Sequence, residues 1–514
     1  MDLQPHQIAK IAEYQLAALA FAERLFSPTH LGKHWISDEL GMDRPGYSHN
    51  ETEAIAIIMR EADKTGMELY QDLAGNAYMV YPGVDRQKPA VLIGSHLDAV
   101  KRGGPFDGPA GIVSALSAVK VLHDAKMDDA AFAPPQDICV AVWRCEESPR
   151  FEKFGIGSGI ATGNADENIL RRATREGQTL EELMIDTRFG DESQKAADMG
   201  KLKIKIAQRE CLIPFEECID SALEIHIEQY DTLLKARQKI PSLNLGIVNV
   251  IKGNVRVPRF SFRGTSQHSG TGTQDDRNDA GLKLIDFLAL VKRGILYLEG
   301  GPKFLRWTRI WRKNDLVLTF PIFGTKNDNL TSTPALAETA FEVRSTDSNV
   351  LRKAEAILRR CAKKVLQANG EPYNEEDLRA TKTEPVRLNE KLQSVFRKLA
   401  ENLNITTMNL PSPAGHDIMN LAQYVRSVLI FICHNGISHD PKEKLGLNEF
   451  DNPYEIGKPF ADAIKLAAAY MLTEKEPDPS SASKPKKPIG AALLNKGGSR
   501  IEMRDGNVIV CQPT

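Results

Sequence analysis

The stretch "PAVLIGSHLDAVKRGGPFDGPAGIVSALSAVKVLHDA", residues 89–125, joins a strand pattern to a helix pattern through a glycine-rich loop. The strand pattern is a continuous apolar run that ends in His96, and residues 108–125 place apolar side chains at helical spacing. A buried strand followed by a helix predicts an α/β fold. The loop also carries Asp98 and Asp107, which a simple turn does not need, and ligands of α/β sheets gather at the carboxyl ends of strands.

The same alternation of strands and helices recurs along much of the chain. Further strands are predicted at 137–147, 221–229 and 428–439, and a further helix at 51–66. We therefore predict a mixed, mostly parallel sheet covered by helices. Residues 1–26 predict an amphipathic helix and not a signal peptide.

The middle of the chain has a different pattern. Residues 255–264 alternate apolar and polar side chains, as a half-exposed strand does, and a β-α-β-β-α order follows. This order predicts an inserted ferredoxin-like α+β domain over 251–375, whose last helix begins with Ser348 as N-cap and stops at Gly370. The main domain then comprises 1–250 and 376–473, with a linker and a short hairpin over 474–514.

Composition excludes several classes of protein. The 514 residues contain 66 Lys and Arg against 68 Asp and Glu, a formal net charge of −2, which does not favour a nucleic-acid or membrane-surface partner. The longest apolar runs have the length of strands, so no transmembrane segment is predicted. Seven scattered cysteines without CxxC spacing indicate reduced thiols in a cytoplasmic protein; Cys145 is expected to be a small apolar residue on a buried strand.

Residues suited to metal binding lie at the predicted strand ends. They are His96, Asp107, Glu146, Glu147, His226 and His439. Three imidazoles and two carboxylates can hold two divalent cations if one carboxylate bridges them, and such ligands suit zinc, with manganese, cobalt or nickel as alternatives. Asp98 lies on the same strand face as His96 and is expected to orient its imidazole from the second shell.

Eight motifs in order make the sequence recognisable. They are "GSHLDAV", "GGPFDG", "RCEES", "EIHIEQ", "GTSQHSGT", "EVRSTD", "PSPAGHD" and "NGISHDP". Together with the surrounding sequence they cover roughly residues 20–470. On these motifs the chain resembles the amidase/hydantoinase/carbamoylase family of dinuclear zinc amidohydrolases, which includes N-carbamoyl-L-amino-acid hydrolases, allantoate amidohydrolases and β-ureidopropionases and is related to aminoacylase-type metallopeptidases.

The resemblance implies a role for each candidate metal residue. It assigns one zinc to His96 and His226 and the other to Glu147 and His439, with Asp107 as the bridge. Glu146 is not a ligand in this scheme. It acts as the general base on a water between the two metals, whose pKa is lowered towards ~7.

The resemblance also implies substrate-binding residues and a dimer. Arg344 is expected to bind the substrate carboxylate, and Gln229 to contact the substrate. His268 of the inserted lid and dimerisation domain is expected to stabilise the oxyanion in the active site of the partner subunit of a homodimer. His416 is expected to form hydrogen bonds in the second shell of the metal centre.

The sequence departs from the family pattern at several positions. Relatives carry an asparagine where an ungapped alignment places Thr331, and a glycine where this chain has Tyr230. The stretch 294–316 is unusually aromatic and basic, and either shapes the substrate pocket or packs a dimer. Arg277 either contacts the substrate or caps the helix that starts near Asp279, with the cap favoured.

Three functions remain open from the sequence. The first is metal-dependent hydrolysis of the linear amide or ureido bond of a small N-carbamoyl or related N-substituted amino acid. The second keeps the dinuclear site but cleaves another N-acyl amino acid or a dipeptide, which the changes at Thr331 and Tyr230 favour. The third, a binding protein without catalysis, is disfavoured because Glu146 and all five ligands are present.

Overall fold

The chain folds into two compact units in the computed structural model. Residues 3–147, 149–273, 276–297, 315–326, 329–374, 378–436, 438–446, 457–475 and 487–511 are described. One unit combines Met1–Asn249 with Leu388–Thr514, and the other is Val250–Arg387. The second unit extends past the predicted end near 375, because a three-residue strand at Thr381–Thr383 adds to its sheet. A strand this short has no periodicity to reveal it in the sequence.

The first unit is built on one large mixed sheet in the order β8-β15-β7-β5-β6-β4-β3-β16-β17, with β14 also paired to β8. Its strands are β3 (Glu68–Gln71), β4 (Ala77–Tyr81), β5 (Ala90–His96), β6 (Ile138–Trp143), β7 (Ile219–Ile227), β8 (Leu243–Ile251), β14 (Thr406–Ser412), β15 (Arg426–Ile432), β16 (Ser499–Arg504) and β17 (Asn507–Cys511). The four central strands β15, β7, β5 and β6 are parallel, and β8, β4, β3, β16 and β17 join antiparallel. The predicted mixed α/β sheet is confirmed, but the sheet is not mostly parallel, because parallel pairing is confined to its four central strands.

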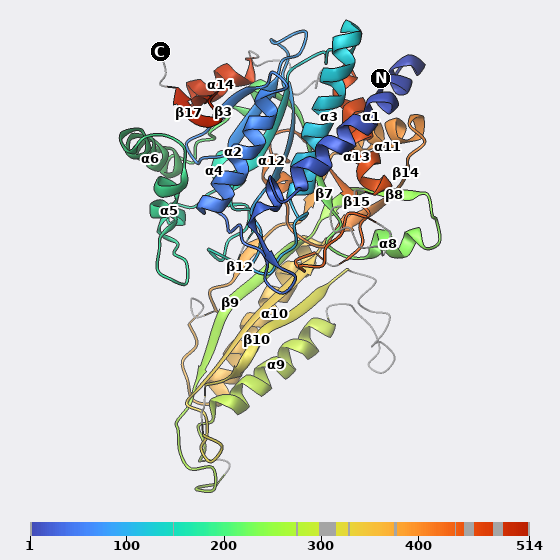
Figure 1. Ribbon diagram of the computed structural model, residues 1–514. Coiled ribbons are helices and arrows are strands. Elements are labelled where there is room, and N and C mark those ends of the chain that lie inside the picture. Colours follow the sequence, from blue (N-terminus) through green and yellow to red (C-terminus); the bar gives the residue numbers. More distant parts are fainter. Residues whose placement is uncertain are drawn as a thin grey trace. The chain divides into compact units, whose positions relative to one another are not determined.

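Helices lie against this sheet (Figure 1), and their buried side chains share an extensive apolar core with it. The helices of this core are α1 (Pro5–Phe26), α2 (His49–Asp63), α3 (Pro109–Asp128), α11 (Glu390–Asn402) and α13 (Lys458–Leu472). A second core includes side chains of α4 (Ile156–Ala161), α5 (Leu180–Thr187) and α6 (Glu192–Ala207). The shorter elements are α7 (Phe215–Cys218), α8 (Thr232–Arg237), α12 (Ile418–Leu421), α14 (Ile489–Asn495), the ribbon β1 (Trp35–Ser37) and β2 (Gly41–Met42), and 3₁₀ turns at Leu31–His34, Ala130–Phe132 and Ile169–Arg171.

Strand alternation decides where the polar side chains point. Leu223, Ile225 and Ile227 of β7 lie in the core that α3 shares, so Glu224 and His226 face the opposite side of the sheet. The parallel register pairs Ile93 of β5 with Leu223. His96 and His226 each come three residues after this pair, and strand alternation places both on that same side of the sheet.

The second unit is a four-stranded antiparallel sheet with two helices. Its elements follow the order β9 (Gly253–Arg263), α9 (Ala280–Tyr297), β10 (Val317–Thr325), β11 (Leu336–Ser345), α10 (Ser348–Ala368) and β12 (Thr381–Thr383). The sheet order is β10-β11-β9-β12, and side chains of both helices lie in its apolar core. This βαββαβ arrangement confirms the predicted ferredoxin-like topology. After it, β13 (Val386–Arg387) pairs with Ile251 and Val250.

The predicted N-cap of the last helix of this unit is wrong by one residue. Asp347 has an extended backbone, and its carboxylate accepts the N–H of Asn349 at 2.8 Å, so Asp347 and not Ser348 caps α10. Aspartate and serine both cap helices well, and the helix begins after the residue whose backbone stays extended, which here is Asp347. The predicted stop is found, because Gly370 adopts a φ of +70° that favours glycine.

The chain beyond the linker docks on the first unit. Strands β16 and β17 form the predicted hairpin around Asp505 and Gly506, and β16 pairs with β3 at the sheet edge. Residues 476–486 of the predicted linker lie outside the described residues.

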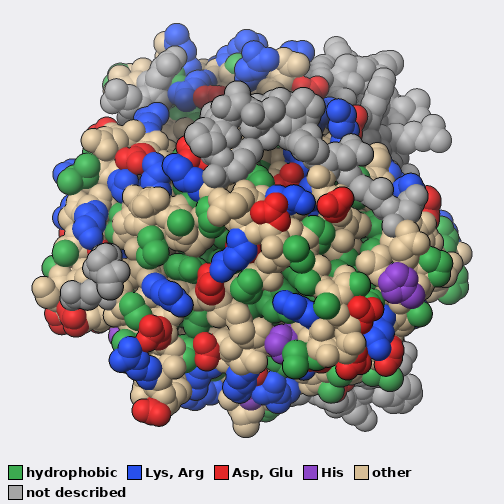
Figure 2. Space-filling view, turned by 90° about the horizontal axis from the view of Figure 1, so that it is seen from above, with side chains coloured by type: hydrophobic (Ala, Val, Ile, Leu, Met, Phe, Trp, Pro, Cys, Tyr) green, Lys and Arg blue, Asp and Glu red, His purple; other side chains and the backbone are tan. Residues whose placement is uncertain are grey.

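On the face shown in Figure 2, acidic and basic side chains are interspersed. In the described part of the chain, no helix combines the length and apolar character that crossing a bilayer requires.

Candidate metal centre

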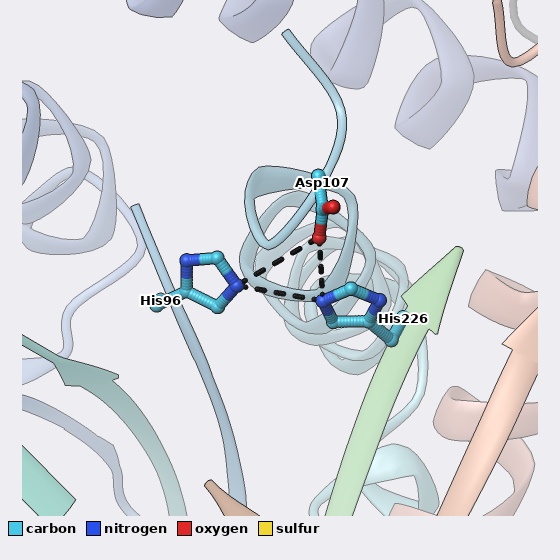
Figure 3. Close-up of side chains that lie close together, drawn as sticks. All are labelled: His96, Asp107 and His226. Carbon is cyan, nitrogen blue, oxygen red and sulfur yellow. Dashed lines mark hydrogen bonds and ion pairs between the residues drawn. The ribbon is translucent and has the colours of Figure 1, made fainter. Parts of the chain in front are cut away.

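Two histidines and an aspartate meet at the carboxyl ends of β5 and β7 (Figure 3). The Nε2 atom of His226 lies 3.0 Å from Oδ1 of Asp107 and 3.4 Å from Nε2 of His96. Nε2 of His96 lies 3.9 Å from the same oxygen. All three residues are buried. Asp107 comes from the loop that leads into α3, so the glycine-rich loop of the opening stretch brings it back over the strand ends.

Asp107 also belongs to a second group of potential ligands, with Glu147 and His439. Nε2 of His439 lies 3.3 Å from Oδ2 of Asp107 and 3.0 Å from Oε1 of Glu147. Each oxygen of the Asp107 carboxylate therefore faces a different group. This is the arrangement that a carboxylate bridging two cations requires.

The spacing and chemistry of these five side chains fit two divalent cations. With metal–ligand bonds of about 2.0–2.1 Å, ligand atoms around a tetrahedral zinc lie about 3.3 Å apart, and the separations above scatter around that value. Burial would raise the pKa of Asp107, but His226 and His439 hold it well below its usual range. Partial burial would lower the pKa of His439, but hydrogen bonds to Asp107 and Glu147 raise it to about 11. In the metal-free protein these imidazoles supply the positive charge that cations would otherwise provide.

Glu146 lies beside the two groups and belongs to neither. Its Oε2 atom is 4.0 Å from Nε2 of His96, and burial raises the pKa of its carboxyl well above its usual range. Cys145, the residue before it, is buried in a left-handed conformation with φ +55°, so it stands after the end of β6 and not on the strand as expected. The turn at Cys145 follows from the end of sheet pairing at Trp143.

Asp98 holds both glutamates and one histidine. Its Oδ1 and Oδ2 atoms accept the backbone N–H groups of Glu146 and Glu147, each at 3.0 Å. Nδ1 of His96 lies 3.1 Å from the backbone carbonyl oxygen of Asp98 and 3.3 Å from its Oδ1. The expected contact with His96 is present, and the backbone contacts to the two glutamates were not foreseen from the sequence.

His416 and Glu224 are further polar residues close to His226. The ring of His416 packs edge-on against the His226 ring at a centroid distance of 4.6 Å, and its Nε2 lies 3.1 Å from Ser412 Oγ. Glu224 completes a third group of potential ligands with these two histidines, and it accepts the N–H of Ile418 at 2.8 Å. Sequence reasoning missed Glu224, although its position two residues before His226 places both on one strand face.

The predicted substrate residues of the first unit lie close to these groups in sequence. Gln229 donates a hydrogen bond from Nε2 to Oδ2 of Asp107 at 3.2 Å. Tyr230 is 61% exposed. Ser438, which was not predicted, donates its hydroxyl to the same oxygen of Asp107. Its position directly before His439 in "GISHDP" was the available signal.

The remaining predicted residues belong to the second unit. Arg344 donates Nε to Glu342 at 2.9 Å, and Thr331 donates its hydroxyl to Asn329 Oδ1 at 2.8 Å. Nδ1 of His268 accepts the N–H of Gly270 at 3.1 Å. Most of the aromatic and basic stretch, 298–314, lies outside the described residues.

Arg277 does not cap the helix α9. Its guanidinium donates to the carbonyl of Ser269. The side chain of Asp279 accepts the N–H of Gly281 at 2.7 Å and that of Leu282 at 3.2 Å. An acceptor suits the unpaired N–H groups at a helix start, and a guanidinium, which only donates, does not.

Residues 92–461 match peptidase family M20/M25/M40. The chain belongs to this family. The M20 chain is 25% identical over 419 residues to the ureidoglycolate hydrolase of Arabidopsis thaliana, over 80% of this chain and 79% of that one. It is 27% identical over 432 residues to allantoate deiminase 1 of Glycine max, over 80% and 83% of the two chains. It is 26% identical over 407 residues to the N-carbamoyl-L-amino-acid amidohydrolase of Rhizobium meliloti, over 79% and 87%.

Solved structures agree with this M20 assignment at the level of the fold. The crystal structure of an amidase of the hydantoinase/carbamoylase family from Burkholderia multivorans matches 90% of this chain and 98% of its own, with a TM-score of 0.62 and 22% identity. The predicted resemblance to that family is confirmed, and so is the prediction of a hydrolase acting on carbon–nitrogen bonds.

Proposed function

We propose that this M20 chain is a dinuclear metal-dependent amidohydrolase that cleaves the linear C–N bond of a small N-carbamoyl or related N-substituted amino acid. The observation that carries the proposal is the shared carboxylate of Asp107, with one oxygen toward His96 and His226 and the other toward Glu147 and His439. The substrate class is supported by the relatives, which are named for allantoate, ureidoglycolate and N-carbamoyl amino acids.

The five side chains would hold two divalent cations, with zinc as the first candidate and manganese, cobalt or nickel as alternatives. When bound, such cations supply Lewis-acid chemistry that acidifies water and polarises a carbonyl. Asp98 fixes the tautomer and orientation of His96 and holds the backbone of Glu146 and Glu147 in place.

Glu146 moves the proton. Its buried carboxylate takes a proton from the attacking water and returns it to the nitrogen that leaves. Burial raises the pKa of this carboxyl and suits it to keep a proton between these two events, whereas two bound cations would favour the ionised form that accepts the proton. The neighbouring Glu147 cannot share this task, because Oε1 of Glu147 faces His439 in the second group.

The test is Glu146→Gln in the metal-loaded protein. We expect unchanged metal content and a loss of turnover of about 10²–10⁴-fold. Glu61→Gln, which changes a buried glutamate of α2 paired with Arg24, is the control and should retain turnover. Wild-type turnover in the Glu146 variant would contradict the proposal.

A substrate panel decides the acyl group. Carbamoyl, formyl, acetyl and aminoacyl derivatives of amino acids should be compared, with ammonia release scored against amino-acid release. Two positions favour a second candidate, which is hydrolysis of an N-acyl amino acid or dipeptide at the same site. Thr331, which is hydrogen-bonded to Asn329, stands where relatives carry an asparagine, and Tyr230 is exposed. Preference for carbamoyl substrates would reject this candidate.

The second unit is proposed to form a homodimer. β10 is an edge strand on which Ile322 and Phe323 are 59% and 66% exposed, and Leu282 and Ile285 of α9 are exposed as well. Such a row of apolar side chains on a sheet edge suits pairing with a second copy. Because Nδ1 of His268 accepts a hydrogen bond, Nε2 carries the proton and can donate to an oxyanion of the partner's active site.

Mixing two inactive variants tests this arrangement. A mixture of His268→Ala and Glu146→Gln proteins should regain part of the wild-type activity if His268 acts in the partner subunit, because one mixed site then has both residues intact. No recovery after subunit exchange would exclude action in trans.

All seven cysteines are free, which supports a cytoplasmic location.

A further inference from the structure

A buried glutamate outside the ligand set joins the two loops that carry Asp107 and His439. Oε2 of Glu443 accepts the backbone N–H groups of Phe106 and Asp107 at 3.1 and 3.2 Å. Oε1 accepts the backbone N–H of His439 at 3.0 Å. Glu443 is 2% exposed, so these bonds are made away from water. One carboxylate thus fixes the backbone of two candidate ligands that come from opposite ends of the chain.

The two loops show independent signs of being fitted around this side chain. A Cβ atom added to Gly104 would collide with the carboxylate of Glu443, so the loop before Asp107 needs a glycine there. His439 has a φ of +66°, a left-handed conformation that is unfavourable for a non-glycine residue. Such a conformation persists only where surrounding contacts determine it, and the bond from His439 N–H to Glu443 is one of them.

We propose that Glu443 is a positioning residue for the second cation, the one assigned to Asp107, Glu147 and His439. The proposal rests on the proposed dinuclear function. Glu443 touches neither a ligand side chain nor a reacting atom in the hydrogen bonds described, and it acts through the backbones that carry Oδ2 of Asp107 and Nε2 of His439. Those two atoms lie 3.3 Å apart, a separation that suits two ligands of one cation.

An isosteric change separates positioning from packing. Glutamine has the shape of glutamate but only one acceptor oxygen, and its NH₂ group would face a backbone N–H. In Glu443→Gln either the pair at Phe106 and Asp107 or the N–H of His439 loses its acceptor. The two loops are then no longer fixed to each other, whereas His96 and His226 stand on β5 and β7 and are not bonded to Glu443 in this arrangement.

The experiment measures metal binding, not activity. Metal-stripped protein is titrated with Zn²⁺ by calorimetry and with Co²⁺ by visible absorption. We expect two cations in the wild type, and in Glu443→Gln one cation of unchanged affinity and a second bound about 10–100-fold more weakly. Asp137→Asn is the matched control, because Asp137 is a buried carboxylate that accepts the N–H of Gly83 at the other end of β6. This control should bind two cations as the wild type does.

A second variant covers the case in which Glu443→Gln fails to fold. Gly104→Ala should weaken binding of the same cation, because the added methyl group displaces Glu443. In the double variant Gly104→Ala/Glu443→Ala the glycine change should lower the affinity little further, because the carboxylate that the methyl group would meet is absent. Two cations of wild-type affinity in folded Glu443→Gln would overturn the inference and leave the proposed function intact. Fewer than two cations in the wild type would refute both. If Glu443→Gln weakened the binding of both cations equally, Glu443 would have a general structural role and the inference would be overturned.

Discussion

Replacing Asp98 by asparagine tests whether the strand-end carboxylate organises the metal centre. The wild-type side chain accepts two buried backbone N–H groups, from Glu146 and Glu147, and faces Nδ1 of His96. Asparagine keeps one acceptor oxygen, so at least one of the three partners loses its acceptor and meets an NH₂ group.

The expected magnitude follows from these contacts. Leaving one buried donor unsatisfied costs about 1–3 kcal/mol of unfolding free energy. Losing the carboxylate that faces a ligating imidazole lowers metal affinity about 10–100-fold, although the backbone carbonyl of Asp98 still lies 3.1 Å from Nδ1 of His96. Asp98→Asn should therefore unfold at lower denaturant and bind the cation of His96 about 10–100-fold more weakly.

The assay is competition with a chromophoric chelator, together with urea unfolding of the metal-free protein. Asp72→Asn is the matched control, because Asp72 is buried and also accepts two backbone N–H groups, from Ala74 and Asn76. The control should lose comparable stability and keep its metal affinity. If both variants keep wild-type metal affinity, Asp98 does not organise the centre and the reasoning is refuted.

Four further outcomes are expected. Chelation should abolish turnover, and a cation at 100 times its Kd should restore about 2.7 kcal/mol of unfolding free energy; retained turnover after complete chelation would contradict the proposed function. Gly108→Ala should abolish cation binding near His96, because residue 108 has φ +85° and its Cβ would lie 2.5 Å from the His96 ring; titration with Zn²⁺ checks this. The folded-state pKa of His439 is raised to about 11, so the imidazole contributes fully to the stability of the metal-free protein below pH 6.5, and this contribution is lost as pH rises through about 11. Urea unfolding across that range should show a decline in the free energy of unfolding. A flat profile would count against the contacts described. Phe323→Glu should convert the proposed dimer to a monomer, which sedimentation velocity would detect, and an unchanged dimer would place the interface elsewhere.

The sequence was sufficient wherever a regular element ended in a polar residue. His96 and His226 end apolar strand runs, strand alternation predicts the face of the sheet that each takes, and the parallel pairing of β5 with β7 brings the two strands together. The ferredoxin-like order was readable for the same reason, because each of its longer elements has its own period.

Contacts made by irregular backbone could not be predicted in this way. Glu443 lies in a loop without periodicity, and its partners are backbone N–H groups whose directions depend on the whole fold. The N-cap at Asp347 and the hydrogen bond of Arg277 to Ser269 depend on local backbone angles that neighbouring capping residues leave undecided.

The distance along the chain between the two halves of the metal centre has a consequence for synthesis. Asp107 and Glu443 are separated by 336 positions. At translation rates of about 5–20 residues per second, roughly 15–70 s pass between the emergence of the first loop and the second. Early in that interval the nascent chain has His96 and Asp107, Glu147 and His226 follow, and His439 comes last, so a cation captured early meets an incomplete set of donors. Correct metal loading is then expected only after the late loop has been made.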